Sequence, residues 1–224
     1  MKKGLAEIVF ILDRSGSMSG LEKDTIGGFN STIEKQKGEA GTALVSTVLF
    51  ANDSEVLYDR VEIEKIEPMT EKQYFGPMEE KRYFAGDSTA LCDAIGGAID
   101  HIANVHKYMR DEDRPEKTIF VITTDGHENA SRRYDADRVR KMVERQKMKY
   151  GWEFIFFGAN IDAVETAKHY GISEERAANF ANDEQGLSLR ARAELEMISC
   201  LRFGENIRED WKDSLETDLR NRKK

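Results

Sequence analysis

Short apolar runs alternate with longer amphipathic stretches along most of the chain. The first run extends from Ile8 to Leu12, and its continuous, partly β-branched composition is typical of a strand buried on both faces of a parallel sheet. Further strands are predicted at 44–50, 118–123 and 152–157, with a short last one at 177–181. The pattern therefore predicts a series of strands along most of the chain.

Between these runs, apolar residues recur every three or four positions, which is the spacing of one face of a helix. The clearest case is a stretch whose apolar members are Leu91, Ala94, Ile95, Ala98, Ile102, Val105 and Met109. Other helices are predicted at 21–37, 135–149, 162–170 and 184–201. Gly38 and Gly171 follow two of them, as glycine often does at a helix end.

Two segments depart from this alternation. Residues 56–63 alternate apolar and polar side chains after an Asn52-Asp53 turn signal, which predicts an antiparallel hairpin strand at a sheet edge. Residues 67–86 have no clear pattern and are left unassigned. Within them, residues 71–76 resemble residues 80–85, and we attribute this near-repeat to chance.

Strands that alternate with helices predict a doubly wound α/β fold. We expect a Rossmann-like three-layer sandwich with a central, mostly parallel six-stranded sheet and one antiparallel edge strand. The domain would span residues 1–203, and residues 204–224 would form a charged, helical C-terminal extension. In that extension an apolar stripe indicates a helix that packs on the domain or on a second copy, with a solvated tail as the alternative. Its members are Ile207, Trp211, Leu215 and Leu219.

The composition of the 224-residue chain is that of a soluble globular protein, with 39% hydrophobic and 34% charged residues. Its net charge of −8 argues against nucleic acid as the main partner, because such surfaces usually need a basic excess. The only two cysteines, Cys92 and Cys200, are far apart and favour a reducing compartment. Glu7 interrupts the first apolar run and Asp13 ends it, so we expect no secretory signal, no membrane span and a cytoplasmic protein.

Polar residues with metal-binding chemistry follow the first strand. Asp13, Ser15 and Ser17 lie two positions apart, and such residues point the same way in an extended segment. Their oxygen atoms suit a hard divalent cation such as Mg²⁺ or Mn²⁺, whereas the lack of thiolate and imidazole groups makes zinc less favoured. Gly16 allows the backbone to turn sharply between the two serines.

Two other polar segments are expected at the same edge of the sheet. Asp125 follows the strand at 118–123, and Thr89 lies at the start of the long helix that begins at Leu91. Each segment by itself is typical of an ordinary polar loop, turn or helix cap. Their order along the chain, each at a predicted strand end or helix start, favours one shared metal site.

Three motifs resemble those of the von Willebrand factor type A domain family. They are Leu12-Asp13-Arg14-Ser15-Gly16-Ser17-Met18, Ser88-Thr89-Ala90-Leu91-Cys92-Asp93-Ala94-Ile95 and Ile122-Thr123-Thr124-Asp125-Gly126. The resemblance covers about residues 6–201, and the combination of the three motifs is highly specific. It implies that family's metal-ion-dependent adhesion site (MIDAS), in a bacterial-type, stand-alone cytoplasmic form.

The resemblance also implies a role for each site residue. Ser15 and Ser17 would bind one Mg²⁺ or Mn²⁺ ion directly. Thr89 would bind it directly or through water, and Asp13 and Asp125 would hold the coordinated waters. An acidic side chain of a protein partner would complete the coordination shell. The expected function is therefore that of a metal-dependent protein-binding module.

The enzyme classes that share such a sheet fit the motifs poorly. A haloacid-dehalogenase-type phosphatase needs a second aspartate where this chain has Ser15, and a serine hydrolase elbow needs serine where it has Met18. A phosphate-binding loop is also missing from the sequence. We therefore expect no enzymatic activity.

Two alternatives stay open at this stage. One is a metal-dependent phosphoester hydrolase, and the other is a scaffold with a vestigial metal site that binds through the Trp211 stripe. Self-association through the C-terminal helix is left open as well. The residues that would rim the site are expected to be solvated, with contact to a partner as the alternative and, for His127, a role as a base as a further one. They are Asp87, His127, Glu128 and Asn129.

Overall fold

The structure is a computed structural model that describes residues 1–76 and 88–222. Within this part of the chain, six strands form one sheet in the order β3-β2-β1-β4-β5-β6. The strands are β1 (Lys2–Asp13), β2 (Thr42–Phe50), β3 (Ser54–Glu62), β4 (Pro115–Thr124), β5 (Glu153–Gly158) and β6 (Ala177–Asn179).

Strand pairing confirms the predicted fold class. β1 runs parallel to both β2 and β4, and β4-β5 and β5-β6 are also parallel pairs. β3 pairs antiparallel with β2 at one edge, as its alternating pattern predicted. Leu12 lies opposite Leu49 on one side and Thr123 on the other. The carboxyl ends of the two central strands therefore lie next to each other.

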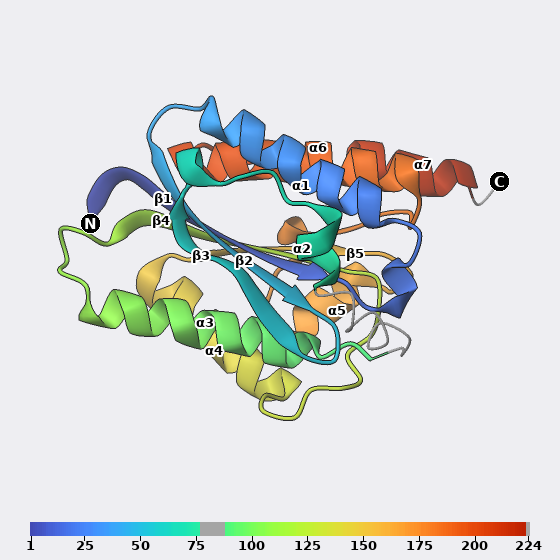
Figure 1. The fold of residues 1–224 in the computed structure, drawn as a ribbon, viewed down its shortest axis with the longest axis horizontal. Helices are drawn as coiled ribbons and strands as arrows, with labels where there is room; N and C mark the ends of the chain where they lie inside the picture. The colour runs from blue at the N-terminus through green and yellow to red at the C-terminus, as the bar shows by residue number, and fades with distance from the viewer. Residues whose placement is uncertain (77–87, 223–224) are drawn as a thin grey trace.

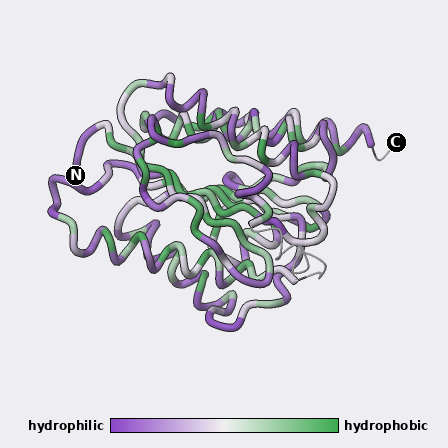
Figure 2. The backbone as a smooth tube through the Cα atoms, in the orientation of Figure 1, coloured by the Kyte–Doolittle hydropathy of each residue, from purple (hydrophilic) through white to green (hydrophobic). Residues whose placement is uncertain are grey.

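Helices cover both faces of the sheet (Figure 1). Ile8 and Phe10 pack toward α1 (Glu22–Lys37), α6 (Glu184–Phe203) and α7 (Asp213–Arg222). Val9 and Ile11 pack toward α3 (Leu91–Tyr108), α4 (Ala136–Tyr150) and α5 (Ala163–His169) on the other face. This is why the first run is apolar throughout, and Figure 2 shows the strands as the most hydrophobic part of the fold. The described residues also form the short helix α2 (Glu71–Phe75) and the 3-10 turns η1 (Gly16–Met18), η2 (Ile63–Lys65) and η4 (Glu174–Arg176).

The unassigned segment contains one short helix in its described part. Thr70 caps α2, because its side chain accepts a hydrogen bond from the Gln73 amide while Gln73 reaches back to the Thr70 amide. A helix this short has too few turns to produce a periodic pattern. The second half of the near-repeat, at 80–85, lies outside the described residues.

The C-terminal apolar stripe packs on the domain itself. Trp211 and Leu215 are 6% and 1% exposed, and the Trp211 ring contacts Phe157 of β5 edge-on at 6.0 Å between centroids. α7 begins only at Asp213, so Ile207 and Trp211 precede the helix. Self-association through this helix and the division of the chain at residue 203 stay predictions. None of the helices in the described ranges is long and apolar enough to cross a membrane.

Two adjacent glycines of α3 give a matched test of packing against the loop that leads into α4. A Cβ atom on Gly96 would lie 2.4 Å from the Tyr134 ring, whereas one on Gly97 would meet nothing within 4 Å. We expect Gly97→Ala to raise the free energy of unfolding by about 0.5–1 kcal/mol, because alanine favours a helix interior. Gly96→Ala should lower it by about 1–3 kcal/mol. Urea unfolding measures both, and an equal gain from the two variants would contradict the Tyr134 contact.

Candidate metal centre

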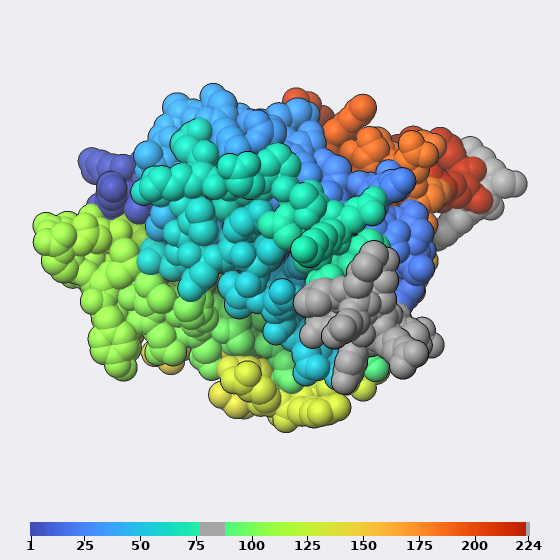
Figure 3. All heavy atoms as spheres, viewed as in Figure 1, coloured from blue at the N-terminus to red at the C-terminus, as the bar shows by residue number. Residues whose placement is uncertain are grey.

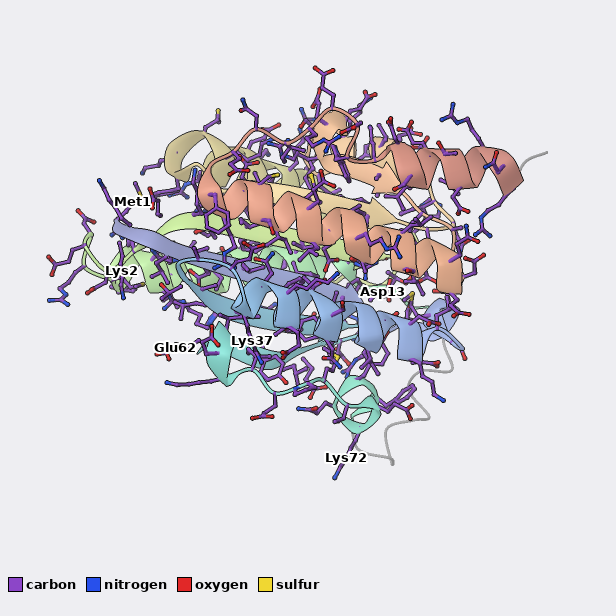
Figure 4. All side chains as sticks on the ribbon, turned by 90° about the horizontal axis from the view of Figure 1, so that it is seen from above. Met1, Lys2, Asp13, Lys37, Glu62 and Lys72 are labelled. Carbon is purple, nitrogen blue, oxygen red and sulfur yellow. The ribbon has the colours of Figure 1, made fainter. Side chains whose placement is uncertain are left out.

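The predicted site residues gather at the carboxyl ends of β1 and β4. Asp13 is the last residue of β1, and Figure 4 labels it at the opposite end of that strand from Lys2. Asp125 directly follows β4, which ends at Thr124. Because the two strands are parallel neighbours, both carboxylates reach the same edge of the sheet.

Asp13 is fully buried and held from three sides. Its Oδ1 accepts a hydrogen bond from the Ser15 amide at 2.8 Å, and its Oδ2 accepts one from the Thr124 hydroxyl at 2.6 Å. The Tyr74 hydroxyl of α2 donates to the Asp13 carbonyl at 2.9 Å. The orientation of this carboxylate is therefore fixed by its own loop and by β4.

The two serines connect the aspartates to each other. Ser15 Oγ lies 3.1 Å from Ser17 Oγ, and the Ser17 hydroxyl donates to Asp125 Oδ1 at 2.5 Å. The extended conformation predicted for Ser17 is wrong, since Ser17 lies in the η1 turn. The tight turn, closed by the Met18 amide on the Ser15 carbonyl, brings the two hydroxyls together instead.

Thr89 joins the site through backbone contacts. Its amide donates to the Asn129 side chain at 2.8 Å, and the Asn129 amide donates to the Thr89 carbonyl at 3.1 Å. Its hydroxyl packs against Gly126, where an added Cβ atom would lie 2.9 Å away from Thr89 Oγ1. The buried Thr89 side chain therefore lies beside the turn that carries Asp125.

Burial raises the pKa of both carboxyl groups. It raises the pKa of Asp13, and it raises that of Asp125 to about 6, with the negative charge of Asp13 adding to the second shift. Within the described residues neither carboxylate has a cationic partner. Two neighbouring buried carboxylates are unfavourable without a positive charge, and a bound cation would relieve both desolvation and repulsion.

The donor set fits a hard divalent cation. It comprises three hydroxyls and two carboxylates, and oxygen ligands of this kind suit Mg²⁺ or Mn²⁺. In the described part of the chain, no group of three or more histidine, cysteine or acidic side chains gathers as a metal cluster. The residues that would hold the ion are Asp13, Ser15, Ser17, Thr89 and Asp125.

Three residues that our sequence interpretation did not single out support the site. Thr124 binds Asp13, and its place next to Asp125 at the strand end was a usable signal. Tyr74 comes from the segment that had no pattern. Asn182 lies beyond β6, and its side-chain amide donates to Asp125 Oδ2 at 3.1 Å. Nothing in the sequence connects a lone asparagine to an aspartate 57 positions earlier.

The rim residues behave differently from one another. His127 is exposed, as expected. Glu128 is not simply solvated, because its carboxylate accepts hydrogen bonds from the amides of Cys92 and Ser131. Asn129 holds the Thr89 loop in place. Glu128 thus satisfies an otherwise unpaired amide in the first turn of α3, which explains the difference. Asp87 lies outside the described residues.

A hollow of about 290 Å³ opens beside the metal centre. Ser15 lines both the hollow and the hydroxyl network. Met18 and Tyr74, both buried, line it together with Phe75 and Glu22. The surface next to the site is therefore concave and partly apolar.

Comparison with known families gives one match that covers most of the chain. The family model described as "von Willebrand factor type A domain" matches residues 7–191. No curated protein matches the chain. The three motifs described above and strands β2 to β6 lie within the matched range, and β1 enters it at Glu7.

Solved structures of low sequence identity share the fold. Proximal thread matrix protein 1 (PTMP1) from the mussel byssus is 15% identical, with a TM-score of 0.57 over 88% of this chain and 46% of that one. Another PTMP1 structure, described as having a zinc occupied MIDAS motif, is 12% identical, with a TM-score of 0.57 over 87% and 48%. The ArnB paralog VWA2 from Sulfolobus acidocaldarius is 20% identical, with a TM-score of 0.51 over 88% and 45%. This chain therefore spans about half the length of these proteins.

Proposed function

Because the chain belongs to the von Willebrand factor type A domain family, we propose that it is a divalent-metal-dependent protein-binding module. Domains of this family commonly mediate metal-dependent protein interactions. The five residues of the centre would form a complete MIDAS for one Mg²⁺ or Mn²⁺ ion. A protein partner would add an acidic side chain to it.

The observation that carries the proposal is the hydrogen-bonded path from Asp13 through Ser15 and Ser17 to Asp125. It joins two buried carboxylates that have no cationic partner among the described residues. When bound, the ion supplies an electrophilic position for an external carboxylate. The serine hydroxyls carry no charge, so they would hold the ion without neutralising it.

We propose binding rather than catalysis. Acid–base catalysis needs a titratable side chain that is free to exchange a proton next to the bound ligand. Glu128 accepts hydrogen bonds from the amides of Cys92 in α3 and Ser131 in its own loop. Asp13 is held by Ser15 and Thr124, and Asp125 is held by Ser17 and Asn182. His127 is exposed at the rim, where it is suited to touch a partner. Together with the hollow beside Ser15, it would contribute to partner selection.

A cytoplasmic, stand-alone form is part of the same proposal. Cys92 is buried, Cys200 is partly buried, and both are free thiols. Burial raises the pKa of Cys92 to about 12, so this thiol stays protonated and unreactive. Free thiols of this kind favour a reducing compartment.

A capture experiment tests the proposed function. Immobilised wild-type protein is expected to retain a specific partner from native lysate in Mg²⁺ and to release it in EDTA. Ser15→Ala should lose that partner, because the substitution removes a metal-binding hydroxyl without adding bulk. Quantitative mass spectrometry of the retained proteins measures both effects.

The matched control is Ser214→Ala, which removes an exposed hydroxyl in α7 far along the chain from the centre. It should retain the partner as the wild type does. A partner that is held equally well in EDTA, or by Ser15→Ala, would contradict the metal-dependent module and favour the scaffold alternative.

A further inference from the structure

One segment of this acidic chain is strongly basic. The whole chain carries 34 basic and 42 acidic residues, yet residues 132–149 contain eight basic and only three acidic ones. This segment comprises α4 and the residues that lead into it. The proposed metal centre lies at the carboxyl ends of β1 and β4, and none of its five residues belongs to this basic segment. The metal centre therefore does not account for the excess of positive charge. This excess needs its own explanation.

The basic side chains of α4 form a ridge on its exposed side. α4 buries Val139, Val143 and Gln146. Positions three, four and seven apart share one side of a helix, so the opposite side presents a continuous row. Figure 2 shows α4 as a mostly hydrophilic helix, and Figure 3 shows part of it at the lower edge of the molecule. We call this row the basic ridge, and its members, all exposed, are Arg138, Lys141, Arg145 and Lys149.

Most of the ridge is not neutralised by the chain itself. In the described parts of the molecule, Arg138 forms its one ion pair with Asp100 at 3.9 Å. Glu144, which flanks the ridge, pairs with Arg140. Among described residues, Lys141, Arg145 and Lys149 have no carboxylate within ion-pair distance, and the neighbour that Arg145 and Lys149 share is the uncharged Tyr150 side chain. Their charge is available to an external ligand.

We propose that the basic ridge is a docking surface for an acidic segment of a protein partner. The segment would lie extended along α4 with acidic side chains at alternate positions. Lys141, Arg145 and Lys149 are four residues apart, which corresponds to about 6 Å along a helix. Alternate side chains on one side of an extended chain repeat at about 6.5 Å. Three carboxylates of such a segment therefore match three cations of the ridge.

Charge and hydropathy favour an acidic protein segment over a nucleic acid or an anionic membrane surface. A nucleic acid would extend past the ridge onto the rest of the chain, which carries the whole acidic excess and would repel it. A membrane surface helix needs a broad apolar face, but among the described residues of α4 the exposed large apolar side chains are Met148, 83% exposed, and the terminal Tyr150, 46% exposed, which make no such face. A short acidic peptide covers the ridge alone and gains an apolar contact at Met148.

The test uses defined probes in EDTA, so that the metal centre contributes nothing. A fluorescein-labelled peptide of alternating glutamate and serine is titrated with the full chain, and fluorescence anisotropy reports binding. At about 0.01 M salt, where the Debye length is about 30 Å, the wild type should bind it. The double variant Lys141→Glu/Arg145→Glu should bind about tenfold more weakly.

The matched control reverses two exposed charges on the other face of the sheet. Lys23→Glu/Lys35→Glu changes the net charge of the chain equally, and neither lysine forms an ion pair among the described residues of α1. This control should keep the wild-type affinity. An equal loss of peptide affinity in both double variants would overturn the proposed docking surface, because the net charge of the chain would then explain binding.

Other probes decide the class of partner and the register. Single-stranded DNA and anionic lipid vesicles are tested in the same way. If either binds through Lys141 and Arg145 and the peptide does not, the proposal is overturned. Absence of peptide binding at low salt would also overturn it. A peptide with glutamate at every third position points its acids to alternate sides when extended, and should bind more weakly. Equal affinity for the two peptides would overturn the extended register. Circular dichroism checks that every variant is folded.

Discussion

Asp125→Asn is expected to weaken Mg²⁺ binding by about 10- to 100-fold and, in EDTA, to make the folded protein more stable than the wild type. The loss of affinity follows because the substitution removes one of the two carboxylates of the centre. The gain in stability follows because burial and the neighbouring charge of Asp13 raise the pKa of Asp125 to about 6. At neutral pH the folded protein therefore holds an unfavourable negative charge that asparagine lacks.

The contacts of residue 125 survive this substitution. The asparagine oxygen can still accept the hydrogen bond from Asn182, and its NH₂ group can donate to Ser17 Oγ, which accepts as well as donates. The expected stabilisation without metal is on the order of 1–3 kcal/mol at pH 7. In excess Mg²⁺ the order should reverse, because ligand binding stabilises only the wild type appreciably.

Isothermal titration calorimetry measures the affinity, and urea unfolding with and without EDTA measures stability. Asp213→Asn, at an exposed position in α7, is the control for loss of one negative charge and should change stability by at most about 0.5 kcal/mol. An Asp125→Asn variant that binds Mg²⁺ as tightly as the wild type would refute the assignment of the centre. One that is less stable in EDTA would refute the electrostatic argument.

Arg190→Met is expected to lower the free energy of unfolding by about 3–5 kcal/mol. Arg190 and Glu194 form an ion pair within α6, and each is 1% exposed. Arg190 also donates to the Thr123 hydroxyl at 3.2 Å and faces the rings of Phe157 and Phe180. Removal of the arginine leaves a buried carboxylate without its cation.

The double variant distinguishes the net contribution of the ion pair to stability from the cost of leaving one buried charge without its partner. Arg190→Met/Glu194→Met should recover most of the lost stability, because well-packed apolar side chains often replace a buried ion pair at little cost. Burial raises the pKa of Glu194, so the single variant should become more stable relative to the wild type as the pH falls and this carboxyl group protonates. A double-mutant cycle by urea unfolding at two pH values measures both effects. A double variant as unstable as Arg190→Met would contradict this account.

The local pattern of the sequence predicted most of the fold. The apolar run at Ile8 to Leu12 identified β1, and the spacing from Leu91 onward identified α3 to within one residue of its end. These elements were predictable because their burial is periodic and repeats over several residues. The segment around α2 was not, because a five-residue helix shows no period.

Glu7 shows what such patterns miss. It is fully buried in β1 and pairs with Arg60 of β3 and His106 of α3. In the sequence it only interrupts an apolar run, and neither partner lies near it along the chain. Whether a charged residue inside a strand is buried depends on which elements pack over it, and this depends on strand order and helix placement.

The sequence by itself determined the strands, most helices and the residue types of the metal centre, because each of these depends on neighbours within a few positions. Only the tertiary structure decided how the residues meet. The η1 turn, rather than strand alternation, joins Ser15 to Ser17, and Asn182 reaches Asp125 across 57 positions. Such contacts depend on strand register and loop packing, which follow from the burial of the whole core at once. The exposed basic face of α4 likewise became clear only when its buried face was known.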